Sequence, residues 1–162
     1  NELSWLDWEN GWDHEFTAFV RHVIQLRAEH PVFRRRRFFQ GRPIRAGVKD
    51  ILWLTPAGQE MTDAEWELDH ARSMAVYLAG DAVLDTDRRG HPLHDDNFLL
   101  LLNAHHDTLP FTLPTVHPGA TWQMMLDTAD APGAPSSSLS AGTEHAVDGR
   151  ALVLLREVLP SP

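Results

Sequence analysis

From residue 41 onward the chain is a series of short apolar runs, each bounded by turn-forming residues. The runs recur at intervals of about 10–20 residues and are too short for typical helices. This spacing predicts an all-β domain, built as a sandwich or a barrel. The predicted strands lie within residues 50–56, 71–80, 97–106, 108–114, 121–130 and 149–158.

Two segments carry further information about the β region. Prolines interrupt residues 108–114, which predicts an edge strand because proline cannot donate a ladder hydrogen bond. Residues 131–142, "APGAPSSSLSAG", are rich in Pro, Gly, Ser and Ala, which is typical of a polar surface loop. We therefore expect this loop to separate two strands near the end of the chain.

One amphipathic helix is predicted ahead of the β region. Asp13 is a good N-cap, and apolar side chains then recur every three or four residues. Pro31 ends the pattern because it pushes His30 out of helical geometry. The helix is expected over residues 13–29, and its apolar stripe must pack against something. The stripe consists of Phe16, Phe19, Val20, Val23 and Ile24.

The charge balance restricts the partners of the chain. Its 14 basic and 23 acidic side chains give a formal net charge of −9 at pH 7. Nucleic acids and acidic membrane surfaces bind cationic faces, so neither is expected as a main partner. The absence of cysteine excludes disulfides and thiol chemistry, which fits a reducing compartment, and we expect a cytoplasmic location.

The first twelve residues, "NELSWLDWENGW", contain three of the six tryptophans of the chain. An indole face can stack on the C–H face of a sugar ring, while neighbouring carboxylates and amides bond its hydroxyls. The alternative is that these tryptophans pack against the helix or a neighbouring domain. A chain that opens on such side chains is expected to be cut from a longer protein. The residues concerned are Asn1, Glu2, Trp5, Asp7, Trp8, Glu9 and Trp12.

A basic run, "FRRRRFF" at residues 33–39, follows the predicted helix. Arginines flanked by aromatic rings can bind phosphates or single-stranded nucleic acid. The alternative is an extended segment whose guanidinium groups pair with local carboxylates, such as those within residues 60–69. The acidic character of the whole chain favours this second interpretation.

Histidines and carboxylates gather in "HPLHDD" at residues 91–96 and in "HHD" at residues 105–107. Zinc sites use these side chains, but the spacing matches no closed or catalytic zinc pattern. His105 and His106 are expected to point to opposite faces at the end of a strand. We therefore predict no metal site and no cofactor.

The segment "MTDAEWELDH" at residues 61–70 predicts a loop with one helical turn. Thr62 or Asp63 is the expected cap, with Glu65 or Trp66 three residues on. Asp63 and Glu65 are two residues apart and do not face each other on a helix, so they form no acid pair. The sequence shows no nucleophile with a base and no glycine loop for phosphate, and no catalytic residue is assigned.

Five stretches, taken in order, resemble a single family. They are "NELSWLDW", "RAEHPVFRRRRFFQGR", "DILWLTPAGQEMTDAEW", "LLLLNAHHDTLPFTLP" and "WQMMLDTA". They are similar to the C-terminal part of bacterial glycogen debranching enzymes, which are isoamylase-type members of the α-amylase superfamily (glycoside hydrolase family 13). The resemblance runs from Asn1 to about Leu155 and is weakest over residues 129–146.

The resemblance implies an architecture. Members of the family have a catalytic (β/α)₈ barrel followed by a C-terminal antiparallel β-sandwich. Residues 1–40 would then be the end of the barrel, with residues 1–12 as the loop after strand eight and residues 13–29 as the last barrel helix. Residues 41–162 would be the sandwich. The implied fold class is mainly β, with one amphipathic helix whose apolar stripe packs on the rest of the barrel.

The resemblance also implies a function. Family members hydrolyse α-1,6-glucosidic branch linkages of glycogen or limit dextrin by a retaining mechanism with two carboxylates about 5 Å apart. Those carboxylates lie on barrel strands upstream of this chain, so the chain alone is expected to be inactive. Its implied partners are glycogen, limit dextrin or malto-oligosaccharide, and the remainder of the barrel. The residues implied to contact or shape the glucan site are Asn1, Glu2, Trp5 and Trp8.

Two other interpretations stay open. The β domain can be a stand-alone carbohydrate-binding or accessory module, which requires an exposed aromatic platform. Trp53, Trp66, Trp122 and Phe111 are the candidates, but each lies in a run that looks half-buried, which favours the core. The third interpretation is an interaction domain that binds a polyanion through residues 34–37 in a salt-dependent manner.

Overall fold

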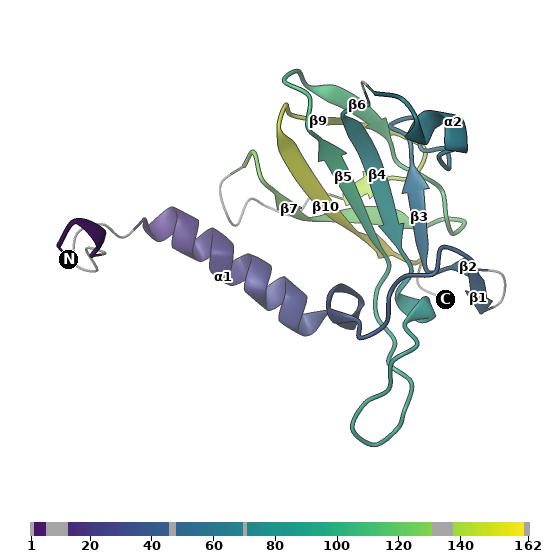
Figure 1. Ribbon diagram of the computed structural model, residues 1–162. Helices are drawn as coiled ribbons and strands as arrows, with labels where there is room; N and C mark the ends of the chain where they lie inside the picture. The colour runs from purple at the N-terminus through teal and green to yellow at the C-terminus, as the bar shows by residue number, and fades with distance from the viewer. Residues whose placement is uncertain (1, 6–12, 46–47, 70, 131–137, 161–162) are drawn as a thin grey trace.

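The computed structural model describes residues 2–5, 13–45, 48–69, 71–130 and 138–160. Most of this structure is antiparallel β-sheet, and one long helix lies near the N-terminus (Figure 1). The expected fold class, a mainly β chain with one amphipathic helix ahead of a β-sandwich, is confirmed. Among the described residues, no helix combines the length and apolar character needed to cross a membrane.

The main sheet has six strands in the order β3-β4-β5-β10-β7-β8, and all of its neighbouring strands are antiparallel. A second sheet pairs β6 with β9, and a small ribbon pairs β1 with β2. The strand nearest the C-terminus, β10, therefore lies inside the main sheet. The strands are β1 (Pro43–Arg45), β2 (Val48–Lys49), β3 (Ile51–Leu54), β4 (Ser73–Leu78), β5 (Phe98–Asn103), β6 (Leu109–Thr112), β7 (Thr121–Asp127), β8 (Ser138–Ser140), β9 (Glu144–Val147) and β10 (Ala151–Val158).

The long helix begins and ends where the sequence predicts. Asp13 caps it, since its carboxylate accepts the backbone N–H of Phe16 at 2.9 Å. His30, before Pro31, has extended backbone geometry and closes the last turn by donating its N–H to the carbonyl of Leu26. The helical segments are η1 (Glu2–Ser4), α1 (His14–Glu29), η2 (Pro31–Arg34), α2 (Asp63–Trp66) and η3 (Gly80–Ala82).

Side chains of both sheets meet in one buried core. Along β5, Leu99 and Leu101 point into this core, whereas Phe98 belongs to a cluster on the other face. Both faces of β5 are therefore in apolar contact, which explains why its sequence "FLLLLN" is continuously apolar instead of alternating. The core also contains Leu54, Ala75, Tyr77, Phe111, Leu113, Trp122, Val147, Val153 and Leu155.

The other face of the main sheet is covered only in part. The end of α1 and η2 cover one region, where Leu26, Val32 and Phe98 are buried. His22 also reaches the sheet, with its Nε2 3.0 Å from the carbonyl oxygen of Met125. Farther along, the apolar side chains are half-buried; we call this region the open face, and it consists of Leu100, Leu102, Met125, Leu126 and Leu152.

The apolar stripe of α1 is largely exposed. Phe16 and Ile24 are 62% and 63% exposed. Figure 1 shows that the N-terminal half of α1, which carries Phe16, extends beyond the sheet, and Ile24 in the other half is not covered by the sheet either. Within the described structure, most of the stripe therefore has no covering partner.

Asp50 ties the segment after α1 to the sandwich. Its fully buried carboxylate accepts hydrogen bonds from Nη2 of Arg35 and from the backbone N–H groups of Gln40 and Gly41, each at 3.0 Å. Gly41 has a φ of +62°, which favours glycine at this turn. The predicted pairing of residues 34–37 with residues 60–69 is wrong for Arg35, because η2 and the following turn place its guanidinium beside Asp50.

The six predicted strands are confirmed as β3, β4, β5, β6, β7 and β10. The prediction of a loop over residues 131–142 is wrong at Ser138–Ser140, which form β8 and pair with β7. Strands β1, β2 and β9 were not predicted. Strands β1 and β2 contain three and two residues, which is too few to show a period, and β9 has the sequence "EHAV", which contains no apolar run.

Tyr77 is the single tyrosine of the chain and gives a direct test of the core. It is buried, and its hydroxyl donates to Oε2 of Glu157 at 3.4 Å. Burial, together with the negative charge of Glu157, raises the pKa of the Tyr77 phenol well above its usual value. In the unfolded chain the phenol ionises at about pH 10. Below about pH 10 the raised pKa therefore makes its full contribution to the stability of the fold. This contribution is lost as the pH rises from there through the higher pKa of the folded state.

We expect the tyrosinate absorbance to appear only when the protein unfolds in alkali. The measurement is an ultraviolet pH titration, with circular dichroism followed in the same samples. A tyrosinate signal at about pH 10 in a protein whose dichroism is still native would contradict the burial of Tyr77.

Candidate functional site

Two of the four residues predicted to contact sugar lie in the described structure. Glu2 begins η1, and Trp5 follows it with 73% of its surface exposed. Asn1 and Trp8 lie outside the described residues. The described part therefore presents a carboxylate and an indole to solvent, which are the two groups that the sugar-binding prediction requires.

A second exposed aromatic group lies at the edge of the sandwich. Trp53 is on the edge strand β3, and Trp66 ends α2. Their ring centroids are 5.4 Å apart and their planes meet at 76°, so the two indoles make an edge-to-face contact. Trp53 is 38% and Trp66 is 48% exposed. We call these two residues the Trp53–Trp66 pair.

Backbone contacts hold the Trp53–Trp66 pair in place. The carbonyl of Trp53 accepts the N–H of Met61 at 2.8 Å, which fixes the returning segment beside β3. The turn between them contains Gly58, whose φ is +74° and where a Cβ would lie 2.8 Å from the carbonyl oxygen of Thr112. A larger residue at this turn would therefore push the segment away from β6.

The predicted cap of α2 is confirmed. The carboxylate of Glu65 accepts the backbone N–H and the hydroxyl of Thr62, at 2.7 and 2.9 Å. These hydrogen bonds, the backbone one first, lower the pKa of Glu65. The cap therefore fixes the start of the short turn that ends in Trp66.

The four aromatic residues considered for a platform divide into two classes. Trp122 and Phe111 are fully buried, as the preference for a core position predicts. The same preference is wrong for Trp53 and Trp66. Both lie at the edge of the sheet, where the described structure leaves their outer sides uncovered.

A cavity of about 340 Å³ lies beside η2. Arg35 lines it, with its guanidinium 4.2 Å from the ring centre of Phe39. The side chain of Arg35 is only 4% exposed, and its Nε and Nη1 find no hydrogen-bond acceptor in the described part of the chain. Phe38 also lines the cavity and is 95% exposed. The cavity therefore combines a nearly buried guanidinium with an exposed aromatic ring.

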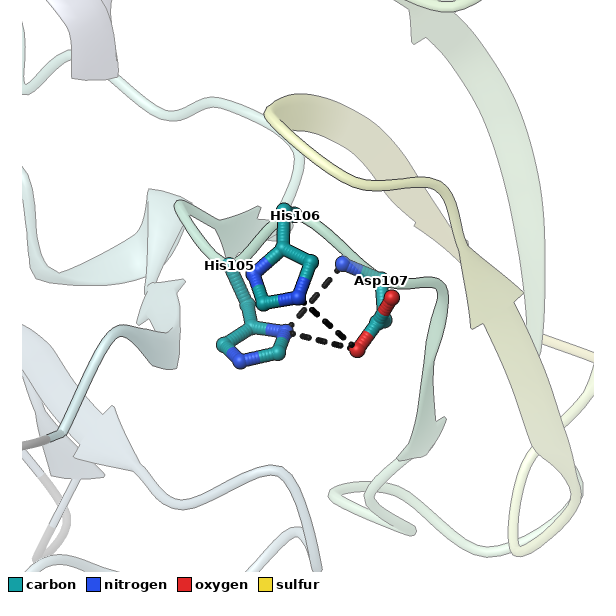
Figure 2. A group of neighbouring side chains, drawn as sticks. All are labelled: His105, His106 and Asp107. Atoms are coloured by element: carbon teal, nitrogen blue, oxygen red, sulfur yellow. Dashed lines mark hydrogen bonds and ion pairs between the residues drawn. The ribbon is translucent and has the colours of Figure 1, made fainter.

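His105, His106 and Asp107 form a cluster after β5 (Figure 2). The two rings are stacked with centroids 4.1 Å apart, and Oδ2 of Asp107 is 3.3 Å from Nε2 of His106 and 3.6 Å from Nδ1 of His105. The expectation that the two histidines point to opposite faces is wrong. Strand β5 ends at Asn103, so both residues lie in the turn that follows, where the alternation of a strand no longer applies.

Asn103 holds this turn together. Its buried amide donates to the carbonyl oxygens of Asp107, Val147 and Asp148 at 2.9–3.0 Å, and its oxygen accepts the N–H of His105. Nδ1 of His105 already accepts the N–H of Asp107 at 3.1 Å. Because this lone pair is used inside the turn, we assign the cluster to the turn rather than to a metal site.

His30, Asp95 and Asp96 form a second cluster, at the junction of α1 and the sandwich. Nδ1 of His30 is 2.7 Å from Oδ1 of Asp95, and Oδ2 of Asp95 accepts the N–H of Val32 at 2.8 Å. The carboxylate of Asp95 therefore fastens the end of α1 and the start of η2. These contacts account for the cluster as a structural link.

Comparisons with known proteins agree with the fold. The sequence model of a family described as "Isoamylase, C-terminal" matches residues 50–156. The chain is 43% identical over 162 residues to the "Glycogen operon protein GlgX homolog" of Mycobacterium tuberculosis (strain ATCC 25618 / H37Rv). It is 31% identical over 114 residues, 70% of its length, to the "Glycogen debranching enzyme" of Klebsiella pneumoniae (strain 342). It is 24% identical over 165 residues to the "Isoamylase" of Pseudomonas amyloderamosa, covering 96% of the chain.

The chain spans only a minor part of these relatives. The alignment with the Mycobacterium protein includes 98% of this chain but only 22% of that protein. The aligned part is 14% of the Klebsiella protein and 19% of the Pseudomonas protein. The residues matched by the family model begin just before β3 and end within β10, so they span the main sheet.

Proposed function

The chain belongs to the isoamylase C-terminal domain family, and on that premise we propose that it is the C-terminal part of a glycogen-debranching glycoside hydrolase. The proposed reaction is hydrolysis of α-1,6-glucosidic branch linkages in glycogen or limit dextrin. The observation that carries the proposal is the family match over residues 50–156. The names of two relatives, glycogen debranching enzyme and isoamylase, support the same substrate class.

In this proposal the chain has a supporting role and the chemistry lies elsewhere. A retaining glycosidase needs a nucleophilic carboxylate and an acid about 5–5.5 Å apart across the scissile bond. We place both in a (β/α)₈ barrel outside this chain. Residues 1–40 would complete that barrel, and residues 41–162 would form the sandwich beside it. The proposed location of the enzyme is the cytoplasm.

Two apolar surfaces support an interface with the barrel. The open face of the main sheet and the exposed stripe of α1 both consist of apolar side chains without full cover in the described structure. Exposed apolar surface of this kind marks a contact site. The remainder of the barrel is the proposed partner, and Leu26 would lie where the two surfaces meet.

The cavity beside η2 supports the same interface. The buried guanidinium of Arg35 has two N–H donors without an acceptor among the described residues. These donors are closed off from the surface and offer no contact to an outside group, whereas the ring of Phe38 at the same cavity is 95% exposed. We propose that the exposed ring of Phe38 packs against the remainder of the barrel.

The N-terminal segment is the proposed contact with substrate. Asn1, Glu2, Trp5 and Trp8 would line the rim of the glucan cleft, where an indole stacks on a sugar ring and a carboxylate bonds its hydroxyls. The exposure of Trp5 supports this role.

A comparison of the full-length protein with the 162-residue chain tests the proposal. We expect the full-length protein to release linear chains from limit dextrin and the isolated chain to release none, both measured by the formation of new reducing ends. Turnover by the isolated chain would contradict the placement of the catalytic carboxylates. Lack of debranching by the folded full-length protein would contradict the function itself.

A further inference from the structure

The Trp53–Trp66 pair lies far from the segment proposed to line the glucan cleft. Figure 1 shows β3 and α2 at one edge of the sandwich, whereas η1 lies beyond the far end of α1. The two indoles keep a large exposed area although they contact each other. Contact with the glucan cleft at η1 therefore does not explain why these two indoles are exposed.

The geometry points to a second glucan-holding surface formed by the Trp53–Trp66 pair, and we propose that it binds outer chains of the polymer. This inference rests on the proposed function, because the proposed substrate identifies the ligand as an α-glucan. An indole face stacks on one glucose ring. The two indoles are in edge-to-face contact with their planes at 76°, so their exposed sides are not coplanar and can each take one ring of a curved α-linked chain. A flat β-linked chain would need two coplanar rings instead.

The charges around the pair fit a neutral ligand. Residues 60–69 contain five carboxylates and no basic side chain. Lys49, which precedes β3, is paired with Glu60 of this acidic segment. Such a surface repels polyanions, whereas carboxylate oxygens accept hydrogen bonds from sugar hydroxyls. The pair therefore matches a neutral polyol better than a nucleic acid or an anionic membrane.

The surface is also pre-organised. Trp53 is part of an ordered strand, and Trp66 follows a turn closed by the Thr62–Glu65 cap. Since neither indole needs a large backbone change to accept a ring, binding would cost little ordering entropy. Leu68 is 45% exposed on the same segment and offers apolar area without a ring, which makes it a matched control.

Affinity electrophoresis of the full-length protein in gels that contain glycogen tests the inference. We expect the W53A/W66A double variant to be retained at least about tenfold less strongly than the wild type, because it loses both stacking contacts. Trp66→Phe should keep most of the retention, because it keeps a ring, whereas Trp66→Leu should lose it. Leu68→Ala should run like the wild type, and gels that contain a soluble cellulose derivative should retain none of these proteins.

Activity on two substrates separates this inference from the proposed function. For the double variant we expect kcat/KM to fall on glycogen much more than on a short branched malto-oligosaccharide. Equal losses on both substrates, or unchanged retention by glycogen, would overturn the holding surface. A lower melting temperature with unchanged retention would show instead that the barrel covers the pair, which also overturns it. If the wild type hydrolyses neither substrate, the proposed function fails, while the gels still report on the surface.

Discussion

Replacement of Asp50 with alanine is expected to lower the free energy of unfolding by about 3–5 kcal/mol. The carboxylate is fully buried and pairs with Arg35, whose side chain is 4% exposed. Its removal leaves a buried guanidinium without its only described acceptor and also frees the N–H groups of Gln40 and Gly41. The measurement is urea unfolding followed by tryptophan fluorescence.

A surface ion pair gives the matched control. Lys49 and Glu60 also form a pair of opposite charges, but the carboxylate of Glu60 is 53% exposed. Solvent screens this pair, so Glu60→Ala should cost at most about 1 kcal/mol. Equal effects of the two substitutions would contradict the view that burial makes the Asp50 contact important.

The helix and the longer strands follow from local patterns in the sequence. Asp13, the three- to four-residue spacing and Pro31 define α1 within one residue of its observed bounds. The apolar runs locate six strands, β3, β4, β5, β6, β7 and β10, because burial requires apolar side chains. Strand order is a different matter. β10 lies between β5 and β7, and nothing local in the sequence encodes that placement.

The partner of a buried charge also depends on the fold. Arg35 and Asp50 are separated by 15 positions along the chain, and 23 acidic side chains were available as partners. η2 and the turn at Gly41, whose N–H donates to Asp50, bring this carboxylate to the guanidinium. The prediction that the arginines pair with local carboxylates therefore holds for Arg35, but its partner is Asp50 and not a carboxylate within residues 60–69.

The exposure of the aromatic residues shows the limit of strand patterns. Alternation places Trp53 on the face opposite to Leu52 and Leu54, but it does not say whether that face is covered. Cover depends on the position of β3 at the sheet edge, which only the structure reveals. From the sequence alone, Trp53, Trp66, Trp122 and Phe111 are therefore equal candidates for an aromatic platform, although only the first two are exposed.

Trp122→Ala is expected to destabilise the fold by about 3–5 kcal/mol. Trp122 is fully buried in the core, where it makes an edge-to-face contact with Tyr77 at 6.4 Å between ring centroids. Its Nε1 donates to the carbonyl of Pro114 at 3.1 Å. The substitution leaves a large cavity between the sheets and also leaves this carbonyl without its indole donor. The measurement is again the free energy of unfolding in urea.

Trp66→Ala is the matched tryptophan control, because it removes an exposed indole from the same chain. Its cost should stay near 0.5 kcal/mol, or about the value for a surface substitution. The two variants should therefore show opposite effects, with Trp122→Ala lowering stability and Trp66→Ala lowering retention by glycogen. If Trp122→Ala kept the stability of the wild type and lost retention, Trp122 would be a binding residue. The core between the two sheets would then be wrongly assigned.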